Sequence, residues 1–325
     1  MRLLMRRSFL LGAAAIGLTT TLARAQHFPT RPIILVVPFA PGGPTDVVGR
    51  IIAQSMSHTL GQQVIVENVA GAGGTSGMTR VARADPDGYT IGLGSMGTQA
   101  AAQGLYPNLA YDPASSFDQL GLVNFTPVLV AARKGFPARD FSEFVSLVRK
   151  QGSKPTHGHA GVGSAAHAAA ILFNDRLGLK PTLVPYRGTG PALTDLVSEK
   201  IDYLTDQALN LVPQVQGGAI RAYAVAAPQR LSVLKDVPTI KELGTDFVFS
   251  NWNALVAPAK LPPAVRDALA RSLARALEDP QVVNRLEELA STVPEKGDRG
   301  PAALQRHVEA EVARVVPLLK EHAGK

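Results

Sequence analysis

Short apolar runs alternate with amphipathic stretches along most of this chain. Residues 33–38 are apolar and predict a strand. Residues 46–60 carry apolar side chains at four-residue spacing before a glycine, which predicts a helix that ends there. Two more apolar runs predict strands at 63–67 and 89–93. Such alternation is typical of a mostly parallel sheet with helices on both faces.

The same pattern starts again after residues 106–118, which contain proline and asparagine. Strands are expected at 125–132, 156–160, 182–185, 201–205, 220–226 and 247–256. Helices are expected at 140–150, 164–177, 191–200, 210–216, 262–278, 280–290 and 301–322. Two sheets of similar make, followed by a late strand and further helices, indicate two lobes. The chain would cross between them near 122–132 and 247–257, and these crossings would form a hinge.

The first 25 residues predict export. A basic start is followed by an apolar run at 8–18, and Ala23-Arg24-Ala25 fits the small-x-small pattern of a signal-peptide cleavage site. The segment 6–10, RRSFL, also resembles a twin-arginine signal. An uncleaved anchor is the alternative, but the apolar run is short for a membrane span. We therefore expect a periplasmic protein that begins near Gln26.

Removal of the signal peptide also changes the net charge of the chain. The chain has 33 basic and 26 acidic residues, but residues 1–25 hold four arginines and no acid, so 29 basic side chains remain after cleavage. This small excess and the lack of an aromatic-rich basic patch argue against a nucleic-acid partner. The chain has no cysteine, so an ordinary apolar core must hold it together without disulfides.

Three glycine-rich turns, at 41–44, 92–97 and 161–166, each follow a predicted strand and precede a helical pattern. A helix N-terminus offers free N–H groups and a partial positive charge, and glycine lets an anion come close. In open α/β sheets such turns lie at the carboxyl ends of the strands, where ligands bind. Three of them predict one shared anion site. The turns at 92–97 and 161–166 fit the dinucleotide pattern and its variant ending in alanine, but neither lies in the first β-α-β unit, and export also argues against a cofactor, so we expect none.

The sequence also offers residues for two other kinds of site. Ser164, His167 and Asp206 could serve an exported hydrolase, but the G-x-S-x-G pattern is absent and Ser164 is better placed as a helix N-cap. His157, His159 and His167 could bind a metal, but the segment offers no cysteine or acid as a further ligand, so we expect no metal site.

Several motifs, in order, resemble the Bug family, the periplasmic solute-binding proteins of tripartite tricarboxylate transporters. The resemblance covers residues 28–322. Its motifs are PTRPIILVVPFAPGGPTDVVGRIIA, VIVENVAGAGGTSG, ADPDGYTIGLGS, GVGSAAH, VPYRGTGPALTDLVSEKIDYLTDQ, IRAYAVAAPQR, DVPTIKELG and WNALVAPAKLP.

The resemblance implies an α/β, two-lobed Venus-flytrap fold of the periplasmic binding protein type II kind. The first lobe would hold residues 26–123 and 248–325, and the second residues 124–247. The chain would not be an enzyme: it would bind a small carboxylate, such as a di-, tri- or aromatic carboxylate. It would act as a monomer and deliver the solute to membrane permease subunits. A ligand sensor for a signalling partner is the alternative.

The resemblance also implies a set of ligand-binding residues. One carboxylate of the ligand would meet backbone N–H groups of the first glycine loop, often through waters. Asp46 could contact an amino group of a ligand or cap the helix, and the second role is favoured. The implied residues are Phe39, Ala40, Gly43, Thr45 and Asp46 in the first loop, Gly163, Ser164, Ala165 and His167 in the second lobe, and Ser95 and Asp206 on matching loops.

Overall fold

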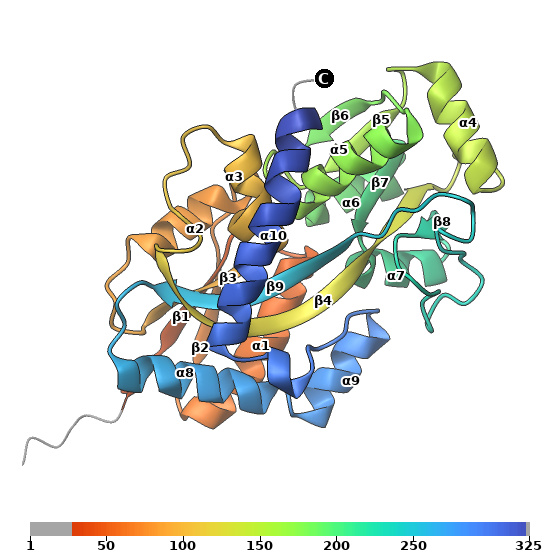
Figure 1. Ribbon diagram of the computed structural model, residues 1–325. Helices are drawn as coiled ribbons and strands as arrows, with labels where there is room; N and C mark the ends of the chain where they lie inside the picture. The colour runs from red at the N-terminus through yellow and green to blue at the C-terminus, as the bar shows by residue number, and fades with distance from the viewer. Residues whose placement is uncertain (1–27, 323–325) are drawn as a thin grey trace, which may run out of the picture.

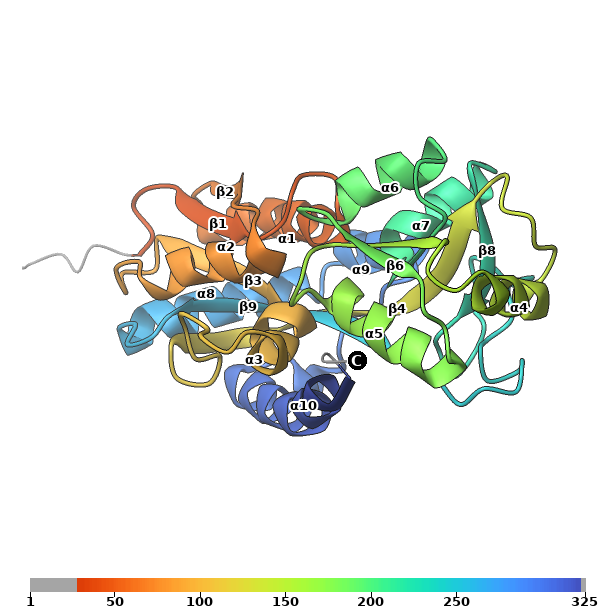
Figure 2. The same ribbon diagram turned by 90° about the horizontal axis from the view of Figure 1, so that it is seen from above.

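The computed structural model describes residues 28–322, which form two α/β lobes lying side by side (Figures 1 and 2). The expected signal peptide, residues 1–25, lies outside the described residues, so its cleavage stays a prediction. Within residues 28–322, no helix has the length and apolar character that crossing a membrane requires.

The first lobe is built on a sheet with the strand order β2-β1-β3-β9-β4. β1 pairs in parallel with β2 and β3, whereas β9 runs antiparallel to both β3 and β4. The carboxyl ends of β1 and β3 therefore meet at one edge, where ligand-binding loops gather in such folds. The strands are β1 (Ile33–Val37), β2 (Val64–Asn68), β3 (Thr90–Ser95), β4 (Phe117–Arg133) and β9 (Ser250–Pro258).

The second lobe repeats this arrangement. Its strands β5 and β6 are parallel, β5 and β7 are parallel, and β4 pairs antiparallel with β7 and β8. The carboxyl ends of β5, β6 and β7 thus form a second edge of the same kind. The strands are β5 (Thr156–His159), β6 (Thr182–Pro185), β7 (Tyr203–Gln207) and β8 (Ile220–Val225).

The strand β4 belongs to both sheets. Residues 117–127 pair with β9, and residues 128–133 pair with β7 and β8. Figure 1 shows β4 and β9 running side by side between the lobes. The strand expected at 125–132 is thus the second half of a longer one. Polar residues such as Asp118 and Asn124 interrupt the apolar pattern of the first half, and their strand pairing with β9 is not visible in that pattern.

Helices cover both faces of the first sheet. Alternate residues of β1 point to opposite faces: Leu35 and Val37 pack among residues of α1, α8 and α9, while Val36 packs toward α2 and α10. These helices are α1 (Pro44–Leu60), α2 (Thr75–Ala82), the π-helical turn η2 (Gly97–Ala101), α3 (Ala102–Leu105), α8 (Pro263–Ala276), α9 (Pro280–Glu288) and α10 (Pro301–His322).

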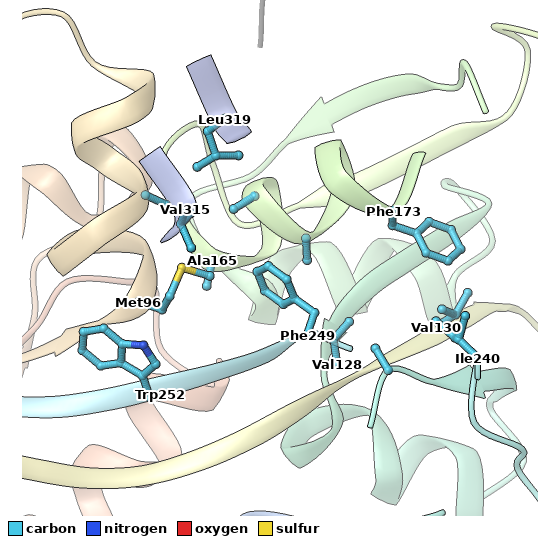
Figure 3. Close-up of a cluster of buried hydrophobic side chains, with 14 of the residues drawn as sticks. Met96, Val128, Val130, Ala165, Phe173, Ile240, Phe249, Trp252, Val315 and Leu319 are labelled. Atoms are coloured by element: carbon cyan, nitrogen blue, oxygen red, sulfur yellow. The ribbon is translucent and has the colours of Figure 1, made fainter. Parts of the chain in front are cut away.

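The second sheet is covered by α4 and α5 on one face and by α6 and α7 on the other. The C-terminal helix α10 contacts η2 and α3 of the first lobe and also α5 of the second. One apolar cluster therefore runs through both lobes, with Met96, Trp252, Val315 and Phe173 among its members (Figure 3). The helices are α4 (Phe141–Gln151), α5 (Ala165–Leu177), α6 (Thr189–Val197) and α7 (Ala208–Gln216).

Local sequence signals placed several helix starts correctly. Asp140 accepts a hydrogen bond from the Glu143 N–H at the start of α4, and Ser164 accepts one from the His167 N–H at the start of α5. The helix α2, in contrast, was not expected. The glycines on either side of its start, at 71, 73, 74 and 77, weaken the helical pattern, and packing of Met78 and Val81 in the core compensates for their low propensity.

Candidate functional site

A cavity lies between the two lobes, at the carboxyl ends of the strands. Its lining residues lie close together, and the free space left inside, about 10 Å³, has room for roughly one water molecule. Both lobes contribute to it, so its shape depends on how they meet. Its lining consists of Phe39, Gly43, Pro44, Thr45 and Ser95 from the first lobe, and Ala160, Ser164, Ala165, Ala166, Thr189, Asp206 and Gln207 from the second.

Four of the described helices begin at this cavity. The first turn of α1 contributes Thr45, that of α5 Ala165 and Ala166, that of α6 Thr189, and Gln207 is the N-cap of α7. First-turn N–H groups have no acceptor within their own helix, and the helix dipole places partial positive charge there. The helix N-termini therefore offer partial positive charge to the cavity, although no lysine, arginine or histidine of the described residues lines it.

Hydroxyl and amide side chains hold the first-lobe side in place. The Thr98 hydroxyl lies 2.9 Å from the Ser95 N–H, which donates to it. The Asn253 side-chain amide donates to the Gly94 carbonyl oxygen at 3.3 Å and to the Thr45 hydroxyl at 3.5 Å. The carbonyl oxygen of the Asn253 side chain is buried and has no hydrogen-bond partner among the described residues.

Asp206 is the one ionisable side chain that lines the cavity among the described residues. Only 1% of it is exposed. The Thr189 hydroxyl donates to its Oδ2 at 2.6 Å, and the Gln207 N–H donates to its Oδ1 at 2.7 Å. Burial raises the pKa of Asp206 to about 6, although these two hydrogen bonds act in the opposite direction.

Asp46 does not line the cavity but braces the loop that does. Its carboxylate accepts hydrogen bonds from the Gly42 N–H, from Nε and Nη2 of Arg50 and from the Asn68 amide, at 2.9 to 3.0 Å. Asn68 also donates to the Phe39 carbonyl oxygen. Burial opposes ionisation of Asp46, but the hydrogen bonds from Arg50, Gly42 and Asn68 together hold its pKa below the usual value.

The N-cap of α1 is Gly43, with no side-chain cap, so the favoured expectation that Asp46 caps this helix was wrong. Asp46 lies inside the first turn, and its side chain reaches back to the loop and across to Arg50 and β2. Arg50 lies four residues on and faces it on the helix surface, which makes a bidentate pair possible.

His167 and Gly163 lie behind the cavity rather than in it. The His167 ring stacks on His159, with ring centroids 4.4 Å apart, and its Nδ1 lies 3.4 Å from the Gly163 N–H. Of the described residues, no group of three or more histidine, cysteine, aspartate or glutamate side chains could hold a metal ion. His157 instead contacts Thr205 and Asn174 in the core.

The implied site residues thus divide into two sets. Seven of them line the cavity together: Phe39, Gly43, Thr45, Ser95, Ser164, Ala165 and Asp206. The other four do not line it: Ala40 lines a second, larger hollow between the lobes, and Asp46, Gly163 and His167 line neither. The inference from sequence missed Thr189 and Gln207 among the polar lining residues. A signal existed for Thr189, because the segment 188–190, GTG, also follows a strand and opens a helix.

The two lobes contact each other directly around the cavity. The Ala40 N–H donates to the Arg187 carbonyl oxygen at 3.2 Å, and the Tyr106 hydroxyl donates to the Val162 carbonyl oxygen at 2.8 Å. The Asn210 amide donates to the Gly42 carbonyl oxygen at 2.5 Å. These bonds join one lobe to the other, so opening the cavity requires breaking them.

A sequence model of the tripartite tricarboxylate transporter family receptor matches residues 48–323. The chain belongs to this receptor family. The Bug-type resemblance of its motifs is confirmed by this match, and so is the two-lobed α/β fold, which solved members share.

The solved structures most similar to this receptor include MatC from Rhodopseudomonas palustris with bound malate. MatC is 43% identical, with a TM-score of 0.87 over 90% of this chain and 100% of its own. The periplasmic binding protein BugD is 40% identical, with a TM-score of 0.88 over 91% of this chain and 99% of its own. The R. palustris protein Rpa4515 with adipate is 31% identical, with a TM-score of 0.86 over 91% of this chain and 98% of its own.

A UPF0065 protein of Agrobacterium vitis is 45% identical over 318 residues, which are 96% of this chain and 91% of the relative. The family and these neighbours are solute-binding receptors, so the chain is a receptor and not an enzyme. The geometry agrees with this, because the Ser164 hydroxyl accepts from a helix N–H while Asp206 is bonded to Thr189 and Gln207. These are not the contacts of a hydrolytic triad.

Replacing Asp46 by alanine is expected to weaken ligand binding about tenfold, or about 1.4 kcal/mol, although Asp46 does not line the cavity. The loop loses its hydrogen bonds to the buried carboxylate, and Asn68 loses one of its two acceptors. Titration calorimetry measures the affinity, and Asp46→Asn, which keeps an acceptor oxygen, should restore most of it. Unchanged affinity of Asp46→Ala would show that the loop holds its shape without this brace.

A valine at position 43 is expected to weaken binding at least tenfold, about 1.4 kcal/mol. Gly43 has an extended backbone with φ of −84°, so the space beside it matters rather than its φ. A single Cβ there would lie 3.6 Å from the Gly190 N and 3.7 Å from the Thr189 N of the other lobe, which is ordinary contact. The two branches of valine would enter the cavity.

The matched control is Gly43→Ala, which adds the Cβ alone and should cost less than threefold. Thr45→Ala should also cost less than Gly43→Val, because we expect backbone N–H groups rather than the Thr45 hydroxyl to hold the ligand. Circular dichroism checks that each variant is folded. A folded Gly43→Val with native affinity would mean that no ligand approaches this turn.

Proposed function

We propose that this receptor captures a small carboxylate between its two lobes in the periplasm and delivers it to the permease of a tripartite tricarboxylate transporter. The observation that carries the proposal is the convergence of four helix N-termini on one cavity that has no basic lining side chain among the described residues. Such a cavity suits an anion held by backbone N–H groups.

The ligands of similar proteins favour a short dicarboxylate. As the lobes stand, the cavity has room for about one water molecule, so they must separate to admit any such ligand. MatC holds malate and Rpa4515 holds adipate, and both are dicarboxylates. Carboxylates at the two ends of a ligand could meet α1 on one lobe and α5 or α6 on the other, which would tie the lobes together.

This arrangement supports a Venus-flytrap mechanism. The lobes are joined by β4 and β9, and both lobes supply lining residues, so solute can enter only when they separate. We also propose that the receptor acts as a monomer. Residues 26–123 with 248–325, and residues 124–247, remain our proposed lobe limits.

A thermal-shift screen of di-, tri- and aromatic carboxylates tests the proposal. A ligand at 100 times its Kd stabilises the folded state by about 2.7 kcal/mol, which is a readable shift. We expect at least one short dicarboxylate to give it. A shift with a sugar, a cation or a neutral amide, and none with any carboxylate, would overturn the proposed ligand class.

Cellular location has a separate test. We expect the protein in an osmotic-shock fraction, with an intact mass that begins near Gln26. A chain that keeps residues 1–25 and stays in the membrane pellet would contradict periplasmic release. Deletion of the permease genes should abolish uptake of the solute but leave binding by the purified receptor unchanged.

A further inference from the structure

The charge of the cavity contains a conflict that the proposed function does not resolve. Helix N-termini surround a space suited to an anion, yet the one ionisable side chain facing that space among the described residues is an acid, Asp206. Like charges at close range repel, most strongly where water is excluded. A plain dicarboxylate would therefore bring its own charge toward a carboxylate that nothing neutralises.

Asp206 has no positively charged partner among the described residues. None of the ion pairs among the described residues includes it. Its neighbours are the Thr189 hydroxyl and the Gln207 N–H, one on each oxygen. A carboxylate oxygen has two acceptor positions, so each oxygen of Asp206 can accept one more hydrogen bond.

An ionised carboxylate can only accept hydrogen bonds, so its partner must supply an N–H or O–H group. Both oxygens of Asp206 already accept a hydrogen bond in this way, from the Thr189 hydroxyl and from the Gln207 N–H. No described side chain in the lining adds a third hydrogen bond to it. The remaining acceptor positions are therefore available to the solute.

We propose that Asp206 is a specificity-determining residue that selects carboxylates carrying a hydroxyl or amino group beside a carboxylate, and rejects the plain dicarboxylate of the same length. This inference rests on the proposed function, since it concerns the same cavity. The solute's donor group forms a hydrogen bond with Asp206, while its carboxylates meet the helix N-termini. Specificity then comes from repulsion of the wrong solute as well as attraction of the right one.

Buried polar sites are known to select ligands by their hydrogen-bond donors. A site built to bond a donor on its ligand rejects the analogue without that donor strongly, because the buried acceptor of the site then stays unpaired. Here the unpaired acceptor is also charged, which adds electrostatic repulsion to the lost hydrogen bond. A hydroxyl and an ammonium satisfy the same requirement, and the ammonium also neutralises the charge.

The test compares succinate, malate and aspartate, which share a four-carbon dicarboxylate chain and differ in the donor. Titration calorimetry at neutral pH on the signal-free chain gives the three dissociation constants. We expect malate or aspartate to bind at least tenfold tighter than succinate, about 1.4 kcal/mol. If malate is preferred the donor is a hydroxyl, and if aspartate is preferred it is an amine. If the carboxylate screen instead selects a longer ligand, the comparison uses adipate and 2-hydroxyadipate.

The variant Asp206→Asn removes the charge and keeps nearly the same shape. The affinities of this variant for succinate and for malate should differ by less than threefold, because succinate is no longer repelled. The matched control is Asp236→Asn, an exposed acid outside the cavity, which changes the net charge equally and should keep the native ratio. If Asp206→Asn does not fold, the donor series on the native protein decides alone.

Three results would overturn the inference. In the first, succinate binds the native protein as tightly as malate and aspartate do. In the second, Asp206→Asn keeps a tenfold preference for malate over succinate. Either result would leave the proposed carboxylate function standing without this inference. Binding of no carboxylate in the whole screen would instead overturn the proposed function, and the inference would fall with it.

Discussion

Replacing Gly97 by alanine is expected to weaken ligand binding at least 100-fold, about 2.7 kcal/mol, while the protein stays folded. Gly97 begins the π-helical turn after β3 in the first lobe. A Cβ at this position would overlap the backbone N of Ala165 and lie 2.8 Å from the carbonyl carbon of Ser164, both in the second lobe. Backbone atoms cannot move aside as a flexible side chain can, so the added methyl group should hold the lobes apart.

The matched control is Gly297→Ala, because Gly297 has open space around it and no positive φ. Solution scattering provides a second readout: ligand should reduce the radius of gyration of the native protein and of the control, but not that of Gly97→Ala. Circular dichroism should show native secondary structure in all three. Native affinity in a folded Gly97→Ala would mean that the ligand does not need the lobes in contact.

Acid is expected to destabilise the protein strongly, by about 3 kcal/mol or more between neutral pH and about pH 4.5. Burial lowers the pKa of His159 to about 3, with a further contribution from His167, and lowers the pKa of His167 to about 4. Burial also lowers the pKa of His157 far below its ordinary value. These histidines stay neutral in the folded protein.

The sign follows from comparing the two states. Below pH 6.5 the unfolded chain binds protons on these histidines and the folded chain does not, so stability falls with pH by about 1.4 kcal/mol per unit for each of them. Asp206 acts in the opposite direction, because its pKa is raised to about 6 and the folded state binds its proton first. Three histidines outweigh one carboxyl, and the net effect is a loss.

Urea unfolding at several pH values measures this effect. The variant His167→Gln removes one of the buried titrating groups and should shrink the loss on acidification by about 2 kcal/mol. His58→Gln is the control, since His58 lies exposed on α1, and it should leave the pH profile unchanged. A native protein equally stable at neutral pH and at about pH 4.5 would contradict the prediction.

Much of the fold could be predicted from neighbouring residues alone. Ser164 and Asp140 cap helices because a side-chain oxygen reaches an N–H three residues on, and that geometry is the same in any surroundings. The strand β1 follows from an apolar run. The helix α2 and the first half of β4 were missed because their glycines and polar residues are stabilised by partners distant in sequence.

The residues of the candidate site also divide into those that the sequence predicted and those that depend on the fold. The glycine turns predicted that loops of both lobes would serve an anion site, and Gly43, Ser95 and Ser164 do line one cavity. Thr189 and Gln207 were missed, and Asp46 turned out to brace a loop. Its partner Asn68 lies on another strand, and no local pattern shows that pairing.

The sequence by itself determined where helices and strands begin, which turns expose backbone N–H groups, and which family the chain resembles, because these depend on residues a few positions apart. Only the tertiary structure decided that four helix N-termini meet at one cavity and that, among the described residues, Asp206 faces it with no basic side chain in the lining. It also decided that Gly97 lies against Ala165. Those facts depend on how the two lobes pack across β4 and β9, where contacts join residues far apart in the chain.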